Sequence, residues 1–304
     1  MPEAMGSRCP LCTGHDFVSH RFGLLRCGTC GLIVNPRIFD AAAADVLNDE
    51  TFGDTYDPEC SSWVRWHTAR RYRRYLGYLR RTGVTAGELL EVGVGAGSFL
   101  RAARDAGFSV SGCDISESLC RRVVQATGIL VHCASLETLP EKKWDVLVMN
   151  HVLEHVHDPV EFLRAAHERL RPLGVLHLAV PNAACWEAGL PGWNAYAKYH
   201  LSYFTPQTLK LALRQAGFAP ELTVTHEDFS SWFPVVFRTL FGIRPASETR
   251  IAASLERVPH LRTLIKSPYR LAMVGTGALL WPLCRLQSAL GYGDELICVV
   301  RKTS

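Results

Sequence analysis

The sequence predicts an α/β protein built on a mostly parallel, doubly wound sheet, and three observations support this. An apolar strand at residues 88–94 runs into the glycine turn Gly93-x-Gly95-x-Gly97, a helix and a second strand that ends at Asp114. Apolar strands and amphipathic helices continue to alternate beyond it. Two Cys-x-x-Cys pairs precede this region. Alternation of this kind produces parallel sheets, because each helix crosses over to the next strand.

Length, composition and charge limit the classes to which the protein can belong. A chain of 304 residues favours roughly two domains, and 48% hydrophobic with 20% charged residues excludes wholesale disorder. The net charge of +4 is too small to require a nucleic-acid partner. We recognise no apolar leader and no uncharged apolar run of about 18 residues. We therefore expect a cytoplasmic protein with reduced thiols.

Four cysteines near the N-terminus form two equal pairs. They are Cys9, Cys12, Cys27 and Cys30. Two such pairs can place four thiolates tetrahedrally around one Zn²⁺. We predict a closed, structural zinc ribbon over residues 1–39, with a short hairpin between the pairs and no open position for catalysis. Gly28 and Gly31 are expected to form the tight turns that direct backbone amides toward the sulfurs.

A basic helix is predicted from Trp63 to Arg81, where aromatic and apolar residues recur every three or four positions. Arginines make it strongly basic, among them Arg70, Arg71, Arg73, Arg74, Arg80 and Arg81. Such a helix can contact RNA phosphates. Alternatively, the arginine stems cover apolar surface while their charged ends stay in water, and we favour this. Residues 40–82 are assigned to a helical linker or cap, with a helix and loop in 40–60.

The remaining core elements follow from periodicity and from helix start and stop residues. Predicted helices cover 98–106, 119–127 and 159–170, and predicted strands cover 108–113, 129–132, 144–150 and 175–180. A loop or short helix is expected over 151–155. Gly107 ends the first of these helices, and the run Arg171-Pro-Leu-Gly174 ends the last.

The glycine turn and its flanking acids indicate a cationic ligand. A glycine cluster alone also occurs in dinucleotide enzymes. Glu91, however, stands just before the first glycine, where its charge opposes a pyrophosphate. S-adenosylmethionine (SAM) carries a sulfonium, an ammonium and a ribose but no phosphate. Asp114 can accept both ribose hydroxyls, or it can cap the next helix instead.

Several longer motifs resemble one family. The runs LLEVGVGAGSFL, VSGCDIS and WDVLVMNHVLEHVHDP are similar to the core of class I SAM-dependent methyltransferases. The run HLSYFTPQTL resembles the subgroup related to ubiquinone-type O-methyltransferases, CGLIVNPR resembles an N-terminal zinc-ribbon extension, and GDELICVVR resembles a closing antiparallel strand. The resemblance implies a Rossmann-like, mostly parallel sheet with an antiparallel last strand.

The same resemblance implies which residues bind SAM. Those implied around the methionine part are Glu91, Gly93, Gly95 and Gly97. Those implied around the nucleoside are Asp114 at the ribose and Ile115, Ala134, Ser135 and Leu136 at the adenine. Asn150 and His151 are implied near the sulfonium, although Asn150 could simply form a turn at the strand end.

Three histidines stand where a general base could act on a hydroxyl acceptor. We favour His200, which follows an aromatic-rich segment that covers the substrate in the family. His151 could touch the cofactor or the substrate and is the second catalytic candidate. His155 is expected to pack or to cap.

The domain organisation follows from these assignments. A SAM-binding core is expected at 83–225, a helical insertion at 226–292 and the closing strand at 293–304. Segments 231–243 and 270–290 are rich in Trp, Phe and Leu. They could cap the active site or contact a membrane surface, but packing on the same domain or on a second subunit is favoured.

The function expected from this resemblance is SAM-dependent methyl transfer to a small molecule, foremost to a hydroxyl in secondary-metabolite, quinone or sugar biosynthesis. One alternative is an RNA methyltransferase that uses the ribbon and the arginine helix. Against it, no Asn-Pro-Pro-Tyr-like tetrapeptide begins at Asn150. The other alternative is a non-catalytic binding module.

Overall fold

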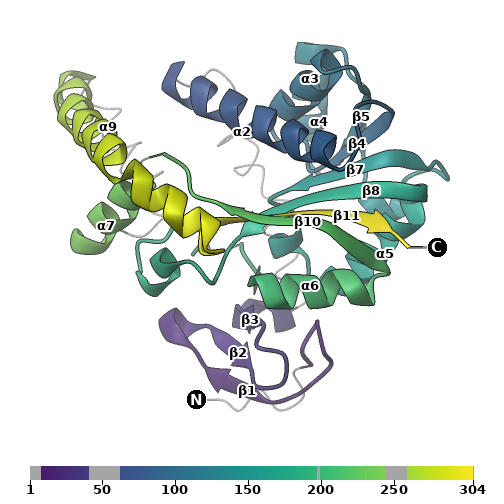
Figure 1. The fold of residues 1–304 in the computed structure, drawn as a ribbon, viewed down its shortest axis with the longest axis horizontal. Helices are drawn as coiled ribbons and strands as arrows, with labels where there is room; N and C mark the ends of the chain where they lie inside the picture. Colours follow the sequence, from purple (N-terminus) through teal and green to yellow (C-terminus); the bar gives the residue numbers. More distant parts are fainter. Residues whose placement is uncertain (1–7, 41–61, 197–198, 230, 244–258, 304) are drawn as a thin grey trace.

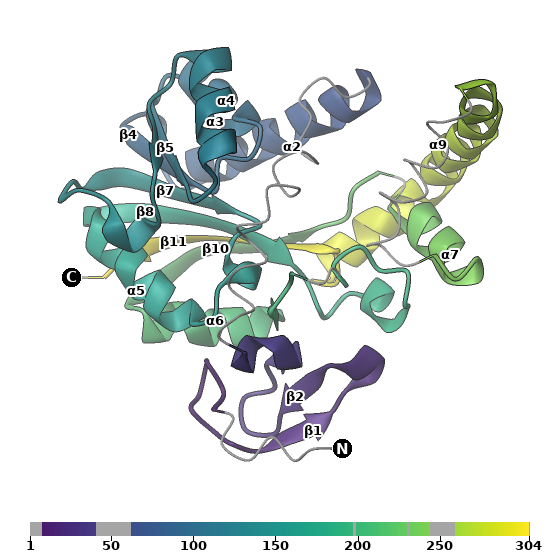
Figure 2. The same ribbon diagram turned by 180° about the vertical axis from the view of Figure 1, so that it is seen from behind.

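A seven-stranded sheet with helices on both faces forms the centre of the molecule (Figure 1). The computed structural model describes residues 8–40, 62–196, 199–229, 231–243 and 259–303. Most of the helix and loop predicted over 40–60 falls outside them. Helices α2, α3 and α4 lie above the sheet in Figure 1, and α5 and α6 lie below it. The N-terminal ribbon lies beneath α6 (Figures 1 and 2).

The strand order confirms the predicted fold class. The order is β10-β11-β8-β7-β4-β5-β6. The strands are β4 (Glu88–Val92), β5 (Ser109–Asp114), β6 (Val131–Cys133), β7 (Trp144–Asn150), β8 (Leu170–Pro181), β10 (Phe218–His226) and β11 (Glu295–Lys302). Strands β4 to β8 pair in parallel, whereas β11 runs antiparallel to both β8 and β10. The last strand is therefore the antiparallel one, as predicted.

Helix ends follow local capping chemistry. The helices are α2 (Ser62–Arg81), α3 (Ser98–Asp105), α4 (Glu117–Thr127), α5 (Pro159–Arg169) and α6 (Pro206–Gln215). Ser116 caps α4 by accepting a hydrogen bond from the amide of Leu119, and Asp158 caps α5 in the same way. Such side-chain acceptors satisfy amides that have no partner within the helix.

Strand β8 starts five residues before its predicted start at Val175. Leu170 pairs with Trp144 of β7, and the Arg171 guanidinium bonds to Asp145 and Glu88 on the neighbouring strands. These contacts between strands extend β8 through a segment whose proline and glycine predicted a turn.

Helix α2 covers apolar surface of the sheet with tyrosine and leucine side chains, and two of its arginines pair within the chain instead of keeping their charged ends in water. Tyr75, Leu76 and Leu79 are buried in a cluster with residues of the central strands. Arg71 Nη2 lies 3.0 Å from Asp228 Oδ2, and Arg74 Nη2 lies 3.5 Å from the other oxygen of that carboxylate. Two arginines that could have contacted RNA are thus bound within the chain.

The ribbon forms a small antiparallel sheet that a strand of the core completes. Its strands are β1 (Phe17–Ser19), β2 (Leu25–Cys27), β3 (Ile33–Val34) and β9 (Ser202–Tyr203). Strands β1 and β2 form the predicted hairpin. Strand β9 belongs to the loop before α6 and pairs with β3, so backbone hydrogen bonds join the ribbon to the core.

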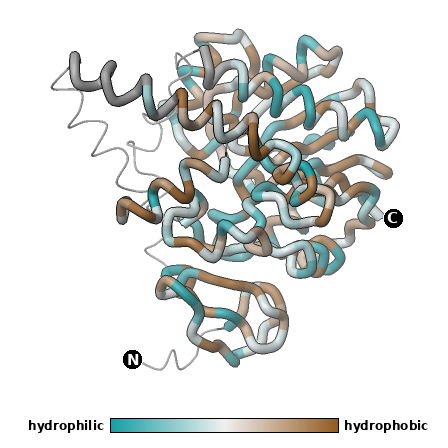
Figure 3. Tube along the Cα trace, turned by 60° about the vertical axis from the view of Figure 1, so that its left-hand side comes forward, coloured by the Kyte–Doolittle hydropathy of each residue, from teal (hydrophilic) through white to brown (hydrophobic). Residues whose placement is uncertain are grey.

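Among the described residues between β10 and β11 lie the helices α7 (Trp232–Leu240) and α9 (Pro259–Ala289). They contact each other, and α9 also contacts β10. Figure 3 shows hydrophobic positions along α9, and Leu271, Leu279 and Leu283 are exposed. Among the described helices, none has the length and apolarity needed to cross a membrane.

Buried carboxyl groups lie where these helices meet the core. Glu227 is fully buried, and its Oε2 accepts a hydrogen bond from the amide of Asp294 at 2.8 Å. Burial, together with the charges of Asp294 and Glu187, raises the pKa of Glu227 to about 10. The folded protein therefore holds a proton on Glu227 that the unfolded chain releases above its ordinary pKa of 4.5.

We predict that Glu227→Gln stabilises the protein at pH 8. The wild-type free energy of unfolding falls as the pH rises from 4.5 toward 10, because only the folded state must keep this proton. Glutamine keeps a hydrogen-bonding group without titrating, so we expect a gain of about 1 kcal/mol or more at pH 8. Urea unfolding followed by circular dichroism at pH 5 and pH 8 measures it.

Glu141→Gln, at an exposed position, is the matched control and should behave as the wild type at both pH values. Equal pH dependence in the wild type and in Glu227→Gln would contradict the buried, protonated state of this carboxyl group.

Candidate functional site

The carboxyl ends of β4, β5 and β7 meet at one edge of the sheet, where a cavity opens. Its lining includes eight of the residues predicted to bind SAM or to act in catalysis. They are Gly93, Gly95, Asp114, Ile115, Ser135, Leu136, Asn150 and His151. The loop residue Ala134 also lines it, as the resemblance implies. Glu91, Gly97 and His200 do not line this cavity. Parallel α/β sheets bind ligands at this edge.

The glycine turn after β4 requires left-handed backbone. Gly93, Gly95 and Gly97 have φ angles of 75°, 48° and 68°, a region that disfavours residues with a Cβ atom. A Cβ atom on Gly97 would lie 2.6 Å from a methyl of Val123 in α4. Gly97 therefore begins α3 and allows α4 to pack closely, and the expectation that it lines the methionine part of the site is corrected.

Asp114 ends β5 and points toward the glycine turn. Burial raises the pKa of Asp114, while hydrogen bonds from the amides of Ser116, Val94 and Gly95 counter that rise. The Ser116 amide donates to Asp114 Oδ1 at 2.9 Å. Ser116, not Asp114, caps α4. The capping alternative for Asp114 is therefore excluded, and its carboxylate lies at the cavity wall.

Glu91 and Asn150 form a buried polar pair behind the cavity wall. Asn150 Nδ2 donates to Glu91 Oε1 at 3.3 Å. Glu91 Oε2 and Asn150 Oδ1 are buried and have no hydrogen-bond partner within the described part of the chain. Burial raises the pKa of Glu91 well above its ordinary value. Two buried acceptors without donors fit a ligand that brings a cationic N–H group, as the ammonium of SAM does.

His151 is held between two buried carboxylates. Its Nδ1 lies 3.3 Å from Glu154 Oε1, and its Nε2 lies 3.0 Å from Glu295 Oε1. Burial favours the neutral ring, but the two carboxylates raise the pKa of His151 to about 10. A ring that already donates from both nitrogens cannot take a proton from an acceptor. The expectation of His151 as a general base is therefore wrong, although His151 does line the cavity.

The carboxylates around His151 stay ionised. Burial disfavours their charge, but the hydrogen bonds from His151 lower the pKa of Glu154 and that of Glu295 to about 2. Glu295 also accepts a hydrogen bond from the Tyr75 hydroxyl, and Arg74 Nη2 lies 3.6 Å from its Oε2. Two carboxylates, one imidazolium and the guanidinium of Arg74 leave this group with no net charge.

Two further histidines lie next to Glu154. His155 ends a short 3-10 helix, Leu153–His155, and lines the cavity. Its Nδ1 donates to the Tyr199 carbonyl at 3.1 Å, which orients the ring at the cavity edge. His155 was expected only to pack or to cap. Its place in the sequence, directly after Glu154 and a few residues after the end of β7, could have predicted that His155 lies at the edge of the cavity.

His200 lies behind His155, with the two ring centroids 4.7 Å apart. Burial, reinforced by His155, lowers the pKa of His200 to about 3, and its Nδ1 is buried without a hydrogen-bond partner among the described residues. The ligand atoms of Glu154, His155 and His200 all lie within 4.8 Å of one another. His200 thus lies in the same cluster as Glu154 and His155. The histidine that lines the cavity is His155, however, and not His200, the base expected from the sequence.

The four N-terminal cysteines converge as predicted. Sγ of Cys9 lies 3.6 Å from that of Cys30, and Sγ of Cys12 lies 3.5 Å from that of Cys27. All four sulfurs lie within 4.8 Å of one another. A tetrahedral site with Zn–S bonds of about 2.3 Å needs sulfurs about 3.8 Å apart, so this set fits Zn²⁺.

The turns of the two cysteine pairs differ from the prediction. Gly31 has the expected left-handed φ of 80°, whereas in the first pair Thr13, a non-glycine, adopts φ of 61°. Gly28 instead leaves room for the side chain of Asp16, because a Cβ atom on Gly28 would lie 2.2 Å from Asp16 Oδ2.

Comparison with known proteins places this geometry in a family. A family model described as "Methyltransferase domain" matches residues 64–222. The ubiquinone biosynthesis O-methyltransferase of Ruegeria pomeroyi is 30% identical over 187 residues, which cover 55% of this chain and 72% of the relative. The enzyme of the same name from Pseudomonas aeruginosa is 30% identical over 110 residues, 34% of this chain and 47% of the relative. The chain thus spans about half of that relative.

Among solved structures, a putative sarcosine dimethylglycine methyltransferase from Galdieria sulphuraria superposes with a TM-score of 0.52. The two sequences are 18% identical, and the match covers 77% of this chain and 86% of the other, which shows a shared fold. The family match extends over half of the chain and includes the strands, the glycine turn and the cavity edge. The chain therefore belongs to the methyltransferase-domain family and is a class I SAM-dependent methyltransferase.

Proposed function

We propose that this enzyme transfers the methyl group of SAM to a hydroxyl of a small organic acceptor, with a quinone precursor as the leading class. The observation that carries the proposal is a histidine, His155, that lines the cofactor cavity and whose ring lies near the buried carboxylate of Glu154. A hydroxyl becomes a good nucleophile when a base removes its proton. The names of the two ubiquinone O-methyltransferase relatives support the same chemistry.

The residues at the cavity edge are proposed to divide the binding of SAM between them. Glu91 and Asn150 would hold the methionine part through their unsatisfied oxygens. Asp114 would accept the ribose hydroxyls, and Ile115, Ser135 and Leu136 would flank the adenine. When bound, SAM supplies an electrophilic methyl group on a sulfonium, so the protein mainly has to align the acceptor with it.

His155 is the proposed base. The hydrogen bond from its Nδ1 to the Tyr199 carbonyl orients the ring, and Nε2 would take the acceptor's proton. The ionised Glu154 carboxylate stabilises the imidazolium that forms. His151 keeps Glu154 ionised and oriented through its own hydrogen bond. His200 packs against the ring of His155 and acts as a positioning residue.

The four cysteines are proposed to hold a structural zinc ion that stabilises the ribbon. A segment of this size cannot bury enough apolar surface to fold alone, so the metal bonds would supply the missing stability. The ribbon would then hold β9 and with it the residues that surround His155.

We expect Gly95→Asp to weaken SAM binding by about tenfold or more, because a side chain would occupy the cavity wall near Asp114. Isothermal titration with SAM measures it, and NAD serves as the ligand that should not bind. Gly83→Asp is the matched control: Gly83 also has a left-handed φ, of 81°, but a Cβ atom there meets nothing within 4 Å. Equal SAM affinity in Gly95→Asp and the control would show that the glycine turn does not hold the cofactor.

We expect His155→Asn to lower kcat by about 10²–10⁴-fold while the Kd for SAM changes by less than about twofold, because a base acts only on the acceptor. His200→Asn should lower kcat by less. Release of S-adenosylhomocysteine, measured over a panel of catechols, hydroquinones and sugars, identifies the acceptor and provides the assay. If His200→Asn is the more damaging variant, the two histidines have the opposite roles.

The purified chain should contain about one zinc ion per molecule, because four thiolates complete one tetrahedral site. Cys27→Ser should lose that zinc and unfold at lower urea concentration. Cys133→Ser, an exposed cysteine outside the cluster, is the control and should keep both properties. Zinc is measured by elemental analysis. Full stability of a zinc-free Cys27→Ser variant would remove the structural role of the metal.

A further inference from the structure

A second, larger cavity lies between the ribbon and the core, and the proposed reaction does not use it. Its volume is about 590 Å³, within the range of sites for small organic ligands. The ribbon contributes one wall from residues 20–33, and the core contributes the other from residues 183–208. None of its lining residues lines the cofactor cavity.

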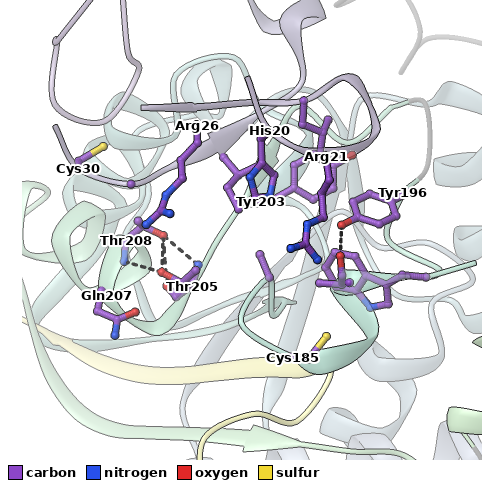
Figure 4. Close-up of a pocket in the computed structure, with 17 residues that line it drawn as sticks. His20, Arg21, Arg26, Cys30, Cys185, Tyr196, Tyr203, Thr205, Gln207 and Thr208 are labelled. Carbon is purple, nitrogen blue, oxygen red and sulfur yellow. Dashed lines mark hydrogen bonds between the residues drawn. The ribbon is translucent and has the colours of Figure 1, made fainter. Parts of the chain in front are cut away.

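The charge of this cavity is positive. Figure 4 shows Arg21 and Arg26 extending from the ribbon toward the core, with His20 between them. No Asp or Glu is found among the described residues that line the cavity. Throughout the described ranges, the structure records no hydrogen bond or ion pair for either guanidinium group. Two arginines without a carboxylate partner therefore converge on one space.

The opposite wall adds a helix start and the side-chain amide of Gln207, whereas the amides of Thr205 and Thr208 already donate to each other's hydroxyls. Helix α6 begins there, and Thr205, Gln207 and Thr208 line the cavity. A helix N-terminus carries partial positive charge and suits an anionic group. The side chains of Thr205 and Thr208 cap the helix reciprocally, which holds this end in a fixed conformation.

Aromatic rings form the rest of the wall. The ring centroids of Tyr196 and Tyr203 are 5.7 Å apart, and those of Tyr196 and Trp193 are 5.0 Å apart. The Tyr196 hydroxyl donates to the Ala188 carbonyl, which orients its ring (Figure 4). A rigid aromatic wall beside two guanidinium groups suits a flat ligand that carries a negative group.

We propose that this cavity is a second binding site that takes a small, ring-bearing organic anion, a phosphate ester or a carboxylate. Its charged group would lie between Arg21, Arg26 and the start of α6, and its ring would contact Tyr196 and Tyr203. The site goes beyond the methyl-transfer site, from which the rings of Tyr203, His200 and His155 separate it.

The test is titration calorimetry of the zinc-loaded full chain with phenyl phosphate, benzoate and inorganic pyrophosphate. S-adenosylhomocysteine is added in one arm and left out of another, so failure of the cofactor site does not affect the result. We expect saturable binding of phenyl phosphate or of benzoate, and the tighter of the two identifies the anionic group. Pyrophosphate, which has no ring, should bind more weakly than the tighter of these two.

Three variants and one control test whether the anion binds in this cavity. Arg21→Gln and Arg26→Gln should each weaken it by about tenfold, because each removes a charge-assisted hydrogen bond. Arg8→Gln, at an exposed position of the same ribbon, is the control and should change nothing. Tyr196→Leu should weaken phenyl phosphate or benzoate but not pyrophosphate.

Three outcomes would overturn the proposal. One is the absence of saturable binding of every probe at millimolar concentrations. Another is binding that neither arginine variant weakens, which would mean that the anion sits elsewhere. The third combines two results: Arg26→Gln loses zinc, and Arg21→Gln binds the anion as tightly as the wild type. Arg26 would then only balance the charge of the cysteine thiolates that follow it in the sequence.

Discussion

The contacts of the buried Glu295 carboxylate hold together the edge of the sheet where the cofactor cavity opens. An unpaired carboxylate inside a protein costs several kcal/mol, so its partners must stay in place. Those partners come from two parts of the chain, Tyr75 and Arg74 of α2 and His151 after β7, whereas Glu295 itself begins β11. The closing strand, the arginine-rich helix and the loop at the cofactor cavity are thereby held in one arrangement.

The ribbon is joined to the same edge by backbone pairing. Val34 pairs with Ser202, and the amide of Asn35 donates to the Leu201 carbonyl at 2.9 Å. The residues directly before this strand are Tyr199 and His200, which contact His155. Backbone pairing therefore joins the ribbon to the segment that contacts His155.

The two cavities carry opposite charge. Two acidic side chains lie at the cofactor cavity: Asp114 lines it and Glu91 is buried beside Asn150, whereas the charges around His151 balance once Arg74 is counted. Arginines line the cavity beneath the ribbon. A cationic ligand and an anionic ligand would thus be sorted by the sign of the surrounding charge, which acts strongly where water is excluded.

The sequence by itself determined the strand and helix alternation, the glycine turn, Asp114 and the cysteine cluster, because each depends on short-range patterns of hydrophobicity, backbone freedom and spacing. Only the tertiary structure decided which histidine reaches the cavity and which one is charged. The pKa of His151 is raised by Glu154, three residues away, and by Glu295, 144 residues away, which only the fold brings to it. Gly97 lies against Val123 of another helix, and a Cβ atom there would clash with it. A side chain's protonation and exposure depend on partners that folding brings together, and no local pattern records them.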